Sequence, residues 1–248
     1  MFFDHRSLWT QLQDKHMFRE YAARRVGKDI LPQLYWVTKN PSDIPFASLP
    51  ERFVVKPTHG SGWVYLVTDK ARVNMSDVIH KCHAWLGRNF YRRLREWVYR
   101  DIEPRILVEE FISSRTGMVP TDYKFYVFDG HVHVIQVDVG RFTDHGRNFY
   151  GCDWNKLDAT SEIKNVAREV ERPKHLEMMI EYAAALGRGL DFIRVDFYDT
   201  DERTYLGELT PTPGAGMNAH RPAAFAISAS RGSFPHYSVA WARGDDAR

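Results

Sequence analysis

Ile193-Arg194-Val195-Asp196-Phe197 and Tyr205-Leu206-Gly207-Glu208-Leu209-Thr210 are the two stretches that decide the fold. The first alternates apolar and polar side chains with a period of two, which is the pattern of a strand with one buried face. The second indicates another strand, and the polar residues 199–203 between them are typical of a turn. We therefore predict an antiparallel hairpin with its turn near residues 201 and 202.

Such a hairpin brings Asp196 opposite or diagonal to Glu208. Two carboxylates that close repel each other unless a hard cation or a shared proton relieves the repulsion, so the hairpin is a candidate magnesium site. The alternative is an outer face whose carboxylates meet water, with Arg194 neutralising Asp196 as a surface ion pair. Taken alone, the hairpin favours the alternative, because two carboxylates are a weak motif.

The composition predicts an ordinary folded protein. The chain has 248 residues, of which 44% are hydrophobic and 27% charged, enough for one sizeable core or two lobes. Its 34 basic and 32 acidic residues are too balanced to indicate binding to nucleic acid or to a membrane surface. No apolar stretch approaches the ~18 residues of a membrane span, and the first residues lack the apolar region of a signal peptide. We therefore expect a cytoplasmic protein without membrane insertion.

The two cysteines carry no metal or disulfide signal. Cys82 and Cys152 are far apart in the sequence and lack the spacing of metal ligands. A disulfide framework or a zinc site is therefore excluded as an interpretation, and we expect both to be structural thiols.

The first part of the sequence contains a helix followed by a Gly-rich hairpin. Residues 14–26 predict a helix with Asp14 as its N-cap, so that Lys15 lies in the first turn, where the helix dipole favours an anion rather than a cation. A solvated lysine is the simpler interpretation of that conflict. Farther on, a strand at 52–56 ends in Lys56, and the loop His59-Gly60-Ser61-Gly62 leads into another strand. Such a loop can turn its backbone N–H groups toward a phosphate, although a plain turn is the commoner meaning of the pattern.

The middle of the sequence predicts one long helix, a second hairpin and a polar loop. Residues 78–97 are amphipathic with several arginines on the outer side, which indicates a core-packing helix or, as the alternative, a surface for an acidic ligand. The pair Asp129-Gly130 between two alternating runs predicts a tight hairpin turn. Residues 141–150 are rich in Arg, His and Asn, which suits a long irregular loop that binds anionic or hydroxylated ligands.

A last helix at 173–187 precedes the acidic hairpin, and the Pro- and Gly-rich residues 210–216 follow it. The fingerprints of serine hydrolases, zinc peptidases and Rossmann folds are absent from the sequence.

The order of these features resembles the ATP-grasp superfamily, and several motifs resemble its TupA-like branch, which is named for teichuronopeptide biosynthesis. The resemblance runs from about Asp14 to Gly216. The matching motifs are Phe53-Val54-Val55-Lys56, His59-Gly60-Ser61-Gly62, Asp122-Tyr123-Lys124-Phe125, Gln136-Val137-Asp138, Arg141-Phe142, Arg147-Asn148-Phe149-Tyr150, Asp153-Trp154 and Gly207-Glu208-Leu209-Thr210-Pro211-Thr212-Pro213-Gly214.

The resemblance implies an α+β ATP-grasp fold, in which two lobes with antiparallel sheets hold ATP between them. On this basis we expect a remnant at 1–13, a phosphate-loop lobe at 14–105 and a lobe with the metal site at 106–248. Superfamily enzymes usually carry another domain in front, which is missing or minimal here. We therefore expect the acceptor site to be built from the remaining residues or to be completed by a partner chain or a homo-oligomer.

The resemblance also implies roles for individual residues in binding ATP. Two lysines would hold phosphates, a flexible lid would cover them, a glutamate would meet the adenine amino group, a backbone segment would line the ring and an aspartate would take the ribose hydroxyls. The phosphate-binding lysines would be Lys15 and Lys56, and the lid would consist of Gly60, Ser61 and Gly62. Glu109 would be the glutamate at the adenine amino group, and the backbone of Glu110, Phe111 and Ile112 would line the ring. Asp122 would be the aspartate at the ribose.

The remaining implied roles concern the metal and the transferred group. Asp196 and Glu208 would bind magnesium, together with Thr210, which stands where many family members have Asn. A neutral hydroxyl can still coordinate Mg²⁺ directly or through water. Arg194 would steady the transferring phosphoryl group, and Lys124, Arg141 and Arg147 would contact the γ-phosphate or the acceptor. Positive charge matters there because phosphoryl transfer is catalysed mainly by positioning and by neutralising charge on the phosphate oxygens.

By this resemblance the protein is an ATP- and Mg²⁺-dependent carboxylate–amine ligase. ATP would convert a carboxylate into an acyl phosphate, and an amine would then attack it, for example joining an amino acid to a uronic acid in surface-polysaccharide biosynthesis. The alternatives are a sugar kinase of the same superfamily and a nucleotide-binding subunit without catalysis. His59 and His145 are candidates for the general base, although a histidine in a polar loop is more often only a hydrogen-bonding residue.

Overall fold

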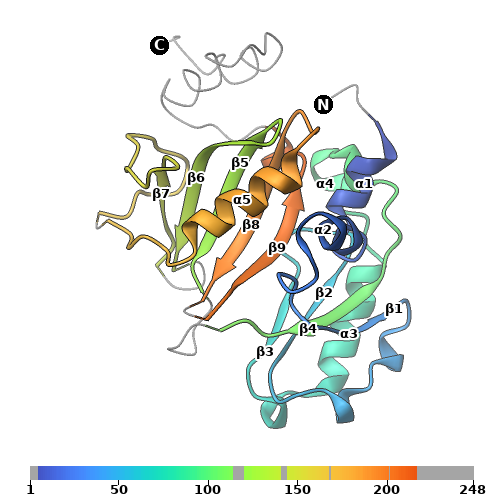
Figure 1. Ribbon diagram of the computed structural model, residues 1–248. Coiled ribbons are helices and arrows are strands. Elements are labelled where there is room, and N and C mark those ends of the chain that lie inside the picture. The colour runs from blue at the N-terminus through green and yellow to red at the C-terminus, as the bar shows by residue number, and fades with distance from the viewer. Residues whose placement is uncertain (1–4, 114–119, 141–143, 168, 201, 217–248) are drawn as a thin grey trace, which may run out of the picture. The chain divides into compact units, whose positions relative to one another are not determined.

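The computed structural model describes residues 5–113, 120–140, 144–167, 169–200 and 202–216. The chain divides into two compact units, Met1–Gly117 and Met118–Arg248. Each described unit is built on one antiparallel sheet with a few helices, so the expected α+β class is confirmed (Figure 1).

The sheet of the first unit has four strands in the order β1 (Leu34–Thr38), β4 (Ile106–Glu110), β2 (Phe53–Pro57) and β3 (Tyr65–Val67). Helix α3 (Met75–Leu86) packs on this sheet. The core between them consists of buried apolar side chains, which include Phe53, Val55, Val67, Val78, Cys82, Trp85, Ile106 and Val108. Cys82 is thus a core thiol, and burial raises its pKa to about 12.

Two expectations about the helices of this unit were wrong. Helix α1 (Ser7–Gln13) ends at Asp14 and α2 (Phe18–Val26) begins three residues after Lys15, so Lys15 lies in the connection rather than in a first helical turn. Asp14 still caps locally, because its Oδ1 accepts from the backbone N–H groups of His16 and Met17. The helix expected at 78–97 stops at Gly87, and the chain continues through the short α4 (Tyr91–Leu94) and the 3₁₀ helix η4 (Trp97–Tyr99).

Three further 3₁₀ turns connect the strands of the first unit. They are η1 (Pro41–Asp43), η2 (Phe46–Ser48) and η3 (Lys70–Arg72). Asn40 and Asp69 cap η1 and η3 by accepting a backbone hydrogen bond two residues ahead.

The boundary between the units differs from the expected one at 105/106. Strand β4 lies in the first sheet, where Val54 pairs with Glu109 and Trp36 pairs with Val108. Since β4 supplies the central pairing of that sheet, the division falls after Gly117. A buried run such as Ile106-Leu107-Val108 shows that a strand is present but does not tell which sheet it joins.

The sheet of the second unit has five strands in the order β7 (Gly146–Tyr150), β6 (His131–Val139), β5 (Asp122–Phe128), β8 (Ile193–Asp199) and β9 (Thr204–Thr210). Helix α5 (Leu176–Gly187) crosses one face of this sheet, and η5 (Pro213–Gly216) follows β9 (Figure 1). The two predicted hairpins are confirmed as β5–β6 and β8–β9.

Strand β7 is a difference from the sequence prediction. The segment 141–150 was expected to be an irregular loop, but its second half pairs with β6 and forms the edge of the sheet. The first residues of that segment, 141–143, lie outside the described residues. Arg147 and Asn148 are adjacent, so each face of β7 carries a polar group and the period of two is hidden.

Within the described residues, no helix is long and apolar enough to cross a membrane.

Candidate active site

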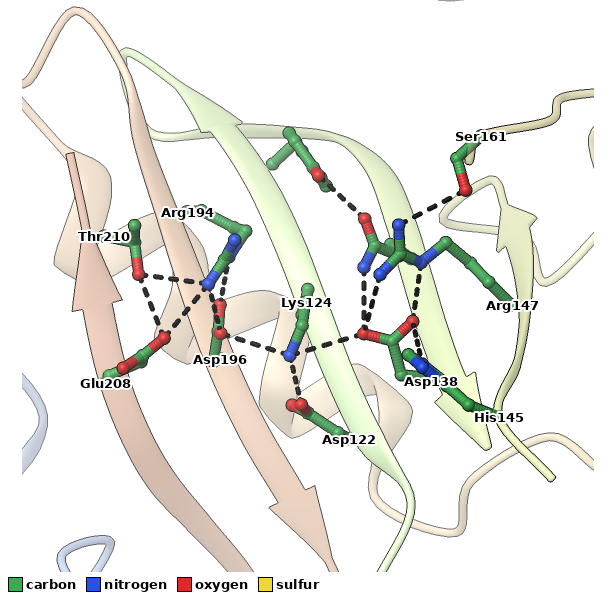
Figure 2. A network of polar contacts seen from close by, with 12 residues as sticks. Asp122, Lys124, Asp138, His145, Arg147, Ser161, Arg194, Asp196, Glu208 and Thr210 are labelled. Atoms are coloured by element: carbon green, nitrogen blue, oxygen red, sulfur yellow. Dashed lines mark hydrogen bonds and ion pairs between the residues drawn. The ribbon is translucent and has the colours of Figure 1, made fainter. Parts of the chain in front are cut away.

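One face of the second sheet carries a chain of charged side chains that extends across all five strands (Figure 2). Its members are Asp122 and Lys124 on β5, Asp138 on β6, Arg147 on β7, Arg194 and Asp196 on β8, and Glu208 and Thr210 on β9. We call this set the ionic face. Side chains directly opposite in an antiparallel pair share a face, and the register pairs Lys124 with Asp196 and Asp138 with Arg147.

Arg194 links the two carboxylates of the acidic hairpin. The register places Asp196 directly opposite Glu208, as predicted. The guanidinium donates to both oxygens of Asp196, from Nε and from Nη2, each at 2.6 Å. The same Nη2 lies 3.1 Å from Glu208 Oε1 and 3.1 Å from Thr210 Oγ1. The Arg194–Asp196 pair considered from the sequence is therefore present, but it is buried rather than on the surface, since Asp196 is only 3% exposed.

The oxygen atoms around Arg194 have the chemistry of a magnesium site. Carboxylate and hydroxyl oxygens from three residues converge on one nitrogen atom, and oxygen is the ligand that Mg²⁺ prefers. The donor set of Asp196, Glu208 and Thr210 therefore fits the expected ion, with Arg194 as its competitor for the same oxygens. No group of three or more His, Cys, Asp or Glu side chains suited to a metal occurs in the described part of the chain. At this point the third oxygen belongs to Thr210.

Lys124 holds the centre of the ionic face. Its ammonium group pairs closely with Asp122 and lies 3.3 Å from Asp196 Oδ2 and 3.7 Å from Asp138 Oδ2. All three carboxylates are buried, and the nearby anions raise the pKa of Lys124 against the opposing effect of burial. Lys124 therefore stays charged and keeps three carboxylates together that would otherwise repel one another.

Asp138 is the residue that the sequence analysis left without a role. It accepts from Arg147 Nε at 2.6 Å and from Gln136 Nε2 at 3.0 Å, and His145 Nε2 lies 3.4 Å from its Oδ1. Arg147 is fixed on its other side by Ser161 Oγ at 3.2 Å. The signal that could have revealed this role is the alternation of Gln136 and Asp138, two polar side chains on the same face of a buried strand.

The two aspartates of the ionic face ionise differently. The pKa of Asp138 falls to about 2, because the favourable interactions with Arg147, Lys124 and Gln136 outweigh the effect of burial. The pKa of Asp196 is raised, because burial outweighs its interactions with Arg194 and Lys124. Asp138 is thus stable as an anion, whereas ionisation of Asp196 is unfavourable in this environment. A cation with a higher charge would stabilise the ionised form of Asp196.

The first unit holds a separate group of predicted ATP-binding residues. Lys15 is buried and donates from Nζ to the carbonyl oxygen of Gly60 at 2.6 Å, so it reaches the Gly-rich loop directly. Lys56 pairs closely with Glu109, whose other oxygen lies 3.7 Å from Arg19 Nη1. Glu109 therefore engages two cations, a contact that the expected role toward adenine did not anticipate.

The two glycines of the loop are needed for different reasons. A Cβ on Gly60 would lie 2.5 Å from the ring of Trp63, so any side chain there would collide with the aromatic ring. Gly62 has open space but a φ of +73°, a backbone conformation that other residues adopt at a cost. Trp63 itself packs edge-on against His59, with ring centroids 5.7 Å apart.

His59 is fixed at the root of this loop. Its Nε2 lies 3.1 Å from the carbonyl oxygen of Trp85 and 3.2 Å from that of Arg88, so this nitrogen carries the proton and donates to both. Burial lowers its pKa, which favours the neutral ring. His59 is thus built into the first unit and His145 into the second, beside Asp138.

The remaining predicted residues have different surroundings. Glu110 accepts at Oε2 from the backbone N–H of Gln33 at 2.9 Å, and Phe111 and Ile112 are half-buried after the end of β4. Asp122, expected at the ribose, is buried beside Lys124 within the ionic face. Arg141 lies outside the described residues.

Comparison with known proteins places this geometry in a family. The family model described as TupA-like ATP-grasp matches residues 4–226. The chain belongs to the TupA-like ATP-grasp family. A comparison with curated protein sequences gave no match.

Solved ligases are distant structural neighbours of this TupA-like protein. D-alanine–D-alanine ligase from Bacillus anthracis is 19% identical, with 81% of this chain and 57% of that chain covered and a TM-score of 0.49. L-amino acid ligase from Bacillus licheniformis is 17% identical, with 83% of this chain and 44% of that chain covered and a TM-score of 0.49. Phosphoribosylamine–glycine ligase from Thermotoga maritima is 12% identical, with 84% of this chain and 52% of that chain covered and a TM-score of 0.49. The chain thus spans about half the length of these solved proteins.

Two features of this family member were not predicted. Asp138 connects Lys124 with Arg147, and Arg19 joins Lys56 at Glu109. In both cases a single buried carboxylate holds two cations, which keeps the positive groups positioned before any ligand binds.

Proposed function

We propose that this TupA-like protein is an ATP-dependent ligase that activates a carboxylate with ATP and passes the acyl group to an amine. One observation carries the proposal. In a chain of an ATP-grasp family, Asp196, Glu208 and Thr210 direct three oxygens at one point, and cations stand beside that point. Such an arrangement suits the binding of Mg²⁺ together with the phosphates of a nucleotide.

Mg²⁺ bound by Asp196, Glu208 and Thr210 would neutralise phosphate charge during the reaction. Its binding would compete with Arg194 for the same oxygens, and the guanidinium released from them would be available to a phosphoryl oxygen. Lys124 and Arg147, held in place by Asp122 and Asp138, would then face the developing charge of the acyl phosphate.

The first unit has candidate phosphate-binding residues of its own. Lys56 would exchange its partner Glu109 for a phosphate, and Lys15 would tie the Gly-rich loop at Gly60. Backbone N–H groups of Gly60, Ser61 and Gly62 would then turn toward the phosphates as the loop closes. The specific substrates, an amino acid or amine and a sugar acid of surface-polysaccharide biosynthesis, are part of the proposal, as is a cytoplasmic location.

The experiment that tests this function measures ADP and free phosphate together. The protein is incubated with Mg·ATP and mixtures of uronic acids, sugar nucleotides, amino acids and amines. Equal amounts of ADP and free phosphate, formed only when both a carboxylate and an amine are present, are expected for a ligase. ADP without matching phosphate would indicate a sugar kinase, because the phosphoryl group then stays on the acceptor. Tight Mg·ATP binding without turnover in any mixture would indicate a non-catalytic nucleotide-binding subunit.

A further inference from the structure

A cavity lies in the second unit, on the side of the sheet opposite to the ionic face. Its volume is about 350 Å³, and its walls include Tyr150, Trp154, Asn155, Lys156, Glu171 and Arg172. Tyr150 is on β7 opposite Ile135, whereas Arg147 of the ionic face is opposite Asp138. Because alternate residues of a strand point to opposite faces, the cavity and the ionic face do not share a surface.

An aromatic pair forms one wall of this cavity. The rings of Tyr150 and Trp154 are stacked, with centroids 4.3 Å apart and planes inclined by only 8°. Tyr150 is almost fully buried, whereas Trp154 is half-buried and contributes to the cavity wall. The indole thus provides a flat apolar surface backed by a second ring.

The wall is held in place before any ligand arrives. Trp154 Nε1 donates to the carbonyl oxygen of Val170 at 3.2 Å, and the N–H of Val170 donates to the hydroxyl oxygen of Tyr150 at 3.0 Å. A tight turn also fixes the backbone, since Trp154 N donates to Gly151 O and Gly151 N donates to Asn155 O, each at 3.0 Å.

Trp154 adopts a strained backbone conformation in this turn. Its φ is +64°, in the left-handed region that a bulky residue rarely adopts. Such strain persists only where the surroundings enforce it, and it occurs preferentially at sites that clamp ligands. The fold therefore holds the indole in position despite this strain.

The polar groups around the cavity are mixed and balanced in charge. Lys156 and Arg172 are cations, Glu169 and Glu171 are anions, and Asn155 offers an amide that both donates and accepts. Because Arg172 is also paired with Glu177, the lining has no excess of positive charge that would favour a nucleotide phosphate. The cavity offers donors and acceptors side by side, which suits a ring that carries many hydroxyl groups, and its size lies within the ~300–1,000 Å³ of small-molecule sites.

We propose that the Trp154 cavity binds a saccharide, one or two sugar rings in size, with an apolar ring face stacked on the indole and hydroxyls bonded to the polar rim. The site would hold a sugar unit other than the reacting one, since the ionic face lies across the sheet. This deepens the proposed function by naming a saccharide as part of the acceptor. Saccharide binding here needs no ATP, however, so the two proposals can fail separately.

Isothermal titration calorimetry without nucleotide tests the site. The probes are methyl α-D-glucopyranoside, methyl β-D-glucuronide, N-acetylglucosamine and cellobiose, with adenosine and glycine as ligands of other classes. We expect at least one saccharide to bind with a dissociation constant near 1 mM, which corresponds to about 4 kcal/mol. Trp154→Ala should weaken this binding at least about tenfold, whereas Trp154→Phe should retain most of it because the stacked pair remains.

Two control variants and a second variant of the site make the result specific. Trp36→Ala, at an exposed tryptophan of the first unit, should leave saccharide binding unchanged. Glu171→Ala, at an exposed position, should weaken binding several-fold without affecting the fold, which covers the case of a Trp154→Ala protein that does not fold. Lys56→Met, in the first unit, should keep full saccharide binding while it loses most of its ATP turnover.

Several outcomes would overturn the proposal. These are the absence of binding by every saccharide at about ten times the expected dissociation constant, binding that Trp154→Ala and Glu171→Ala leave unchanged, and binding of adenosine or glycine without any saccharide. Absence of ATP turnover by the wild-type protein would count against the ligase proposal and would leave the saccharide proposal unaffected.

Discussion

The ionic face of the second unit and the Gly-rich loop of the first unit are built in opposite ways. In the ionic face, buried and half-buried charged side chains of five strands neutralise one another, and Lys124 by itself approaches three carboxylates. In the loop region, most of the construction is backbone: Lys15 bonds to a carbonyl oxygen, and Gly62 supplies a positive φ. Lys56 and Glu109 form the principal buried ion pair there, with Arg19 nearby.

This difference separates stability from function. Removing one partner of a buried ion pair leaves the other charge without compensation, so substitutions in the ionic face should affect folding as well as chemistry. A loop built from backbone groups can change its conformation at little cost to the core. We therefore expect the loop residues to affect mainly nucleotide binding and turnover.

The largest effect on turnover is expected at Asp196, which is both a proposed metal ligand and a member of a buried ion pair. Asp196→Asn keeps the shape of the side chain but removes the charge that faces Arg194 and Lys124. We expect turnover of Mg·ATP to fall by about 1,000-fold, the upper range for losing one preorganised charge interaction. Asp144→Asn is the matched control, because the Asp144 side chain is 86% exposed and should leave turnover unchanged. Full turnover in Asp196→Asn would contradict the metal role assigned to this residue.

Two lysine–glutamate pairs of the first unit allow a second test. Lys56–Glu109 is buried, with 14% and 8% side-chain exposure, whereas Lys39–Glu103 is 65% and 46% exposed. We expect Lys56→Met to lower kcat/KM for ATP by about 100-fold, because a phosphate contact and a positioned charge are lost together.

Lys39→Met should have no effect on kcat/KM, because this exposed pair is not among the predicted nucleotide-binding residues and contributes little to stability. Steady-state kinetics at varied ATP concentration gives both values. Equal effects of the two substitutions would remove the distinction between the buried and the exposed pair.

The pH dependence of stability tests the role of Asp138. Its carboxyl has a folded-state pKa of about 2, below the ordinary value of 3.8, so it stabilises the folded protein when ionised. The contribution is about 2 kcal/mol at neutral pH, and it is lost as the pH falls from about 4 to about 2. Asp138→Asn should therefore be less stable than the wild type at pH 7, and the difference should shrink toward pH 2. Urea unfolding across this pH range measures it, and a difference independent of pH would contradict this account.

The smallest effect is expected at the loop glycines, where the two positions differ in kind. Gly62→Ala places a side chain in open space at a φ of +73°, which should cost about 1 kcal/mol and moderately raise the KM for ATP. Gly60→Ala should cost more, because its Cβ would meet the Trp63 ring. Gly189→Ala is the control, with the same φ of +73° and open space, in the second unit away from the loop. Its stability loss should match that of Gly62→Ala, while its KM for ATP should stay unchanged.

The sequence determined the local part of this protein. Alternation with a period of two identified both hairpins of the second sheet, and the turn between β8 and β9 fixed the register that sets Asp196 against Glu208. The Gly-rich loop between β2 and β3 was also readable, because glycines after a strand that ends in lysine form a local pattern. These features depend on neighbours in the chain, and the sequence contains them directly.

Only the tertiary structure decided which distant residues meet. The sheet to which β4 belongs, the edge strand β7 and the role of Asp138 all depend on which strands pair with one another. Periodicity reveals that a strand has two faces, but not which strand lies beside it or which charge stands opposite. For that reason Asp196 and Glu208 were found from the sequence, whereas the five-strand ionic face that surrounds them was not.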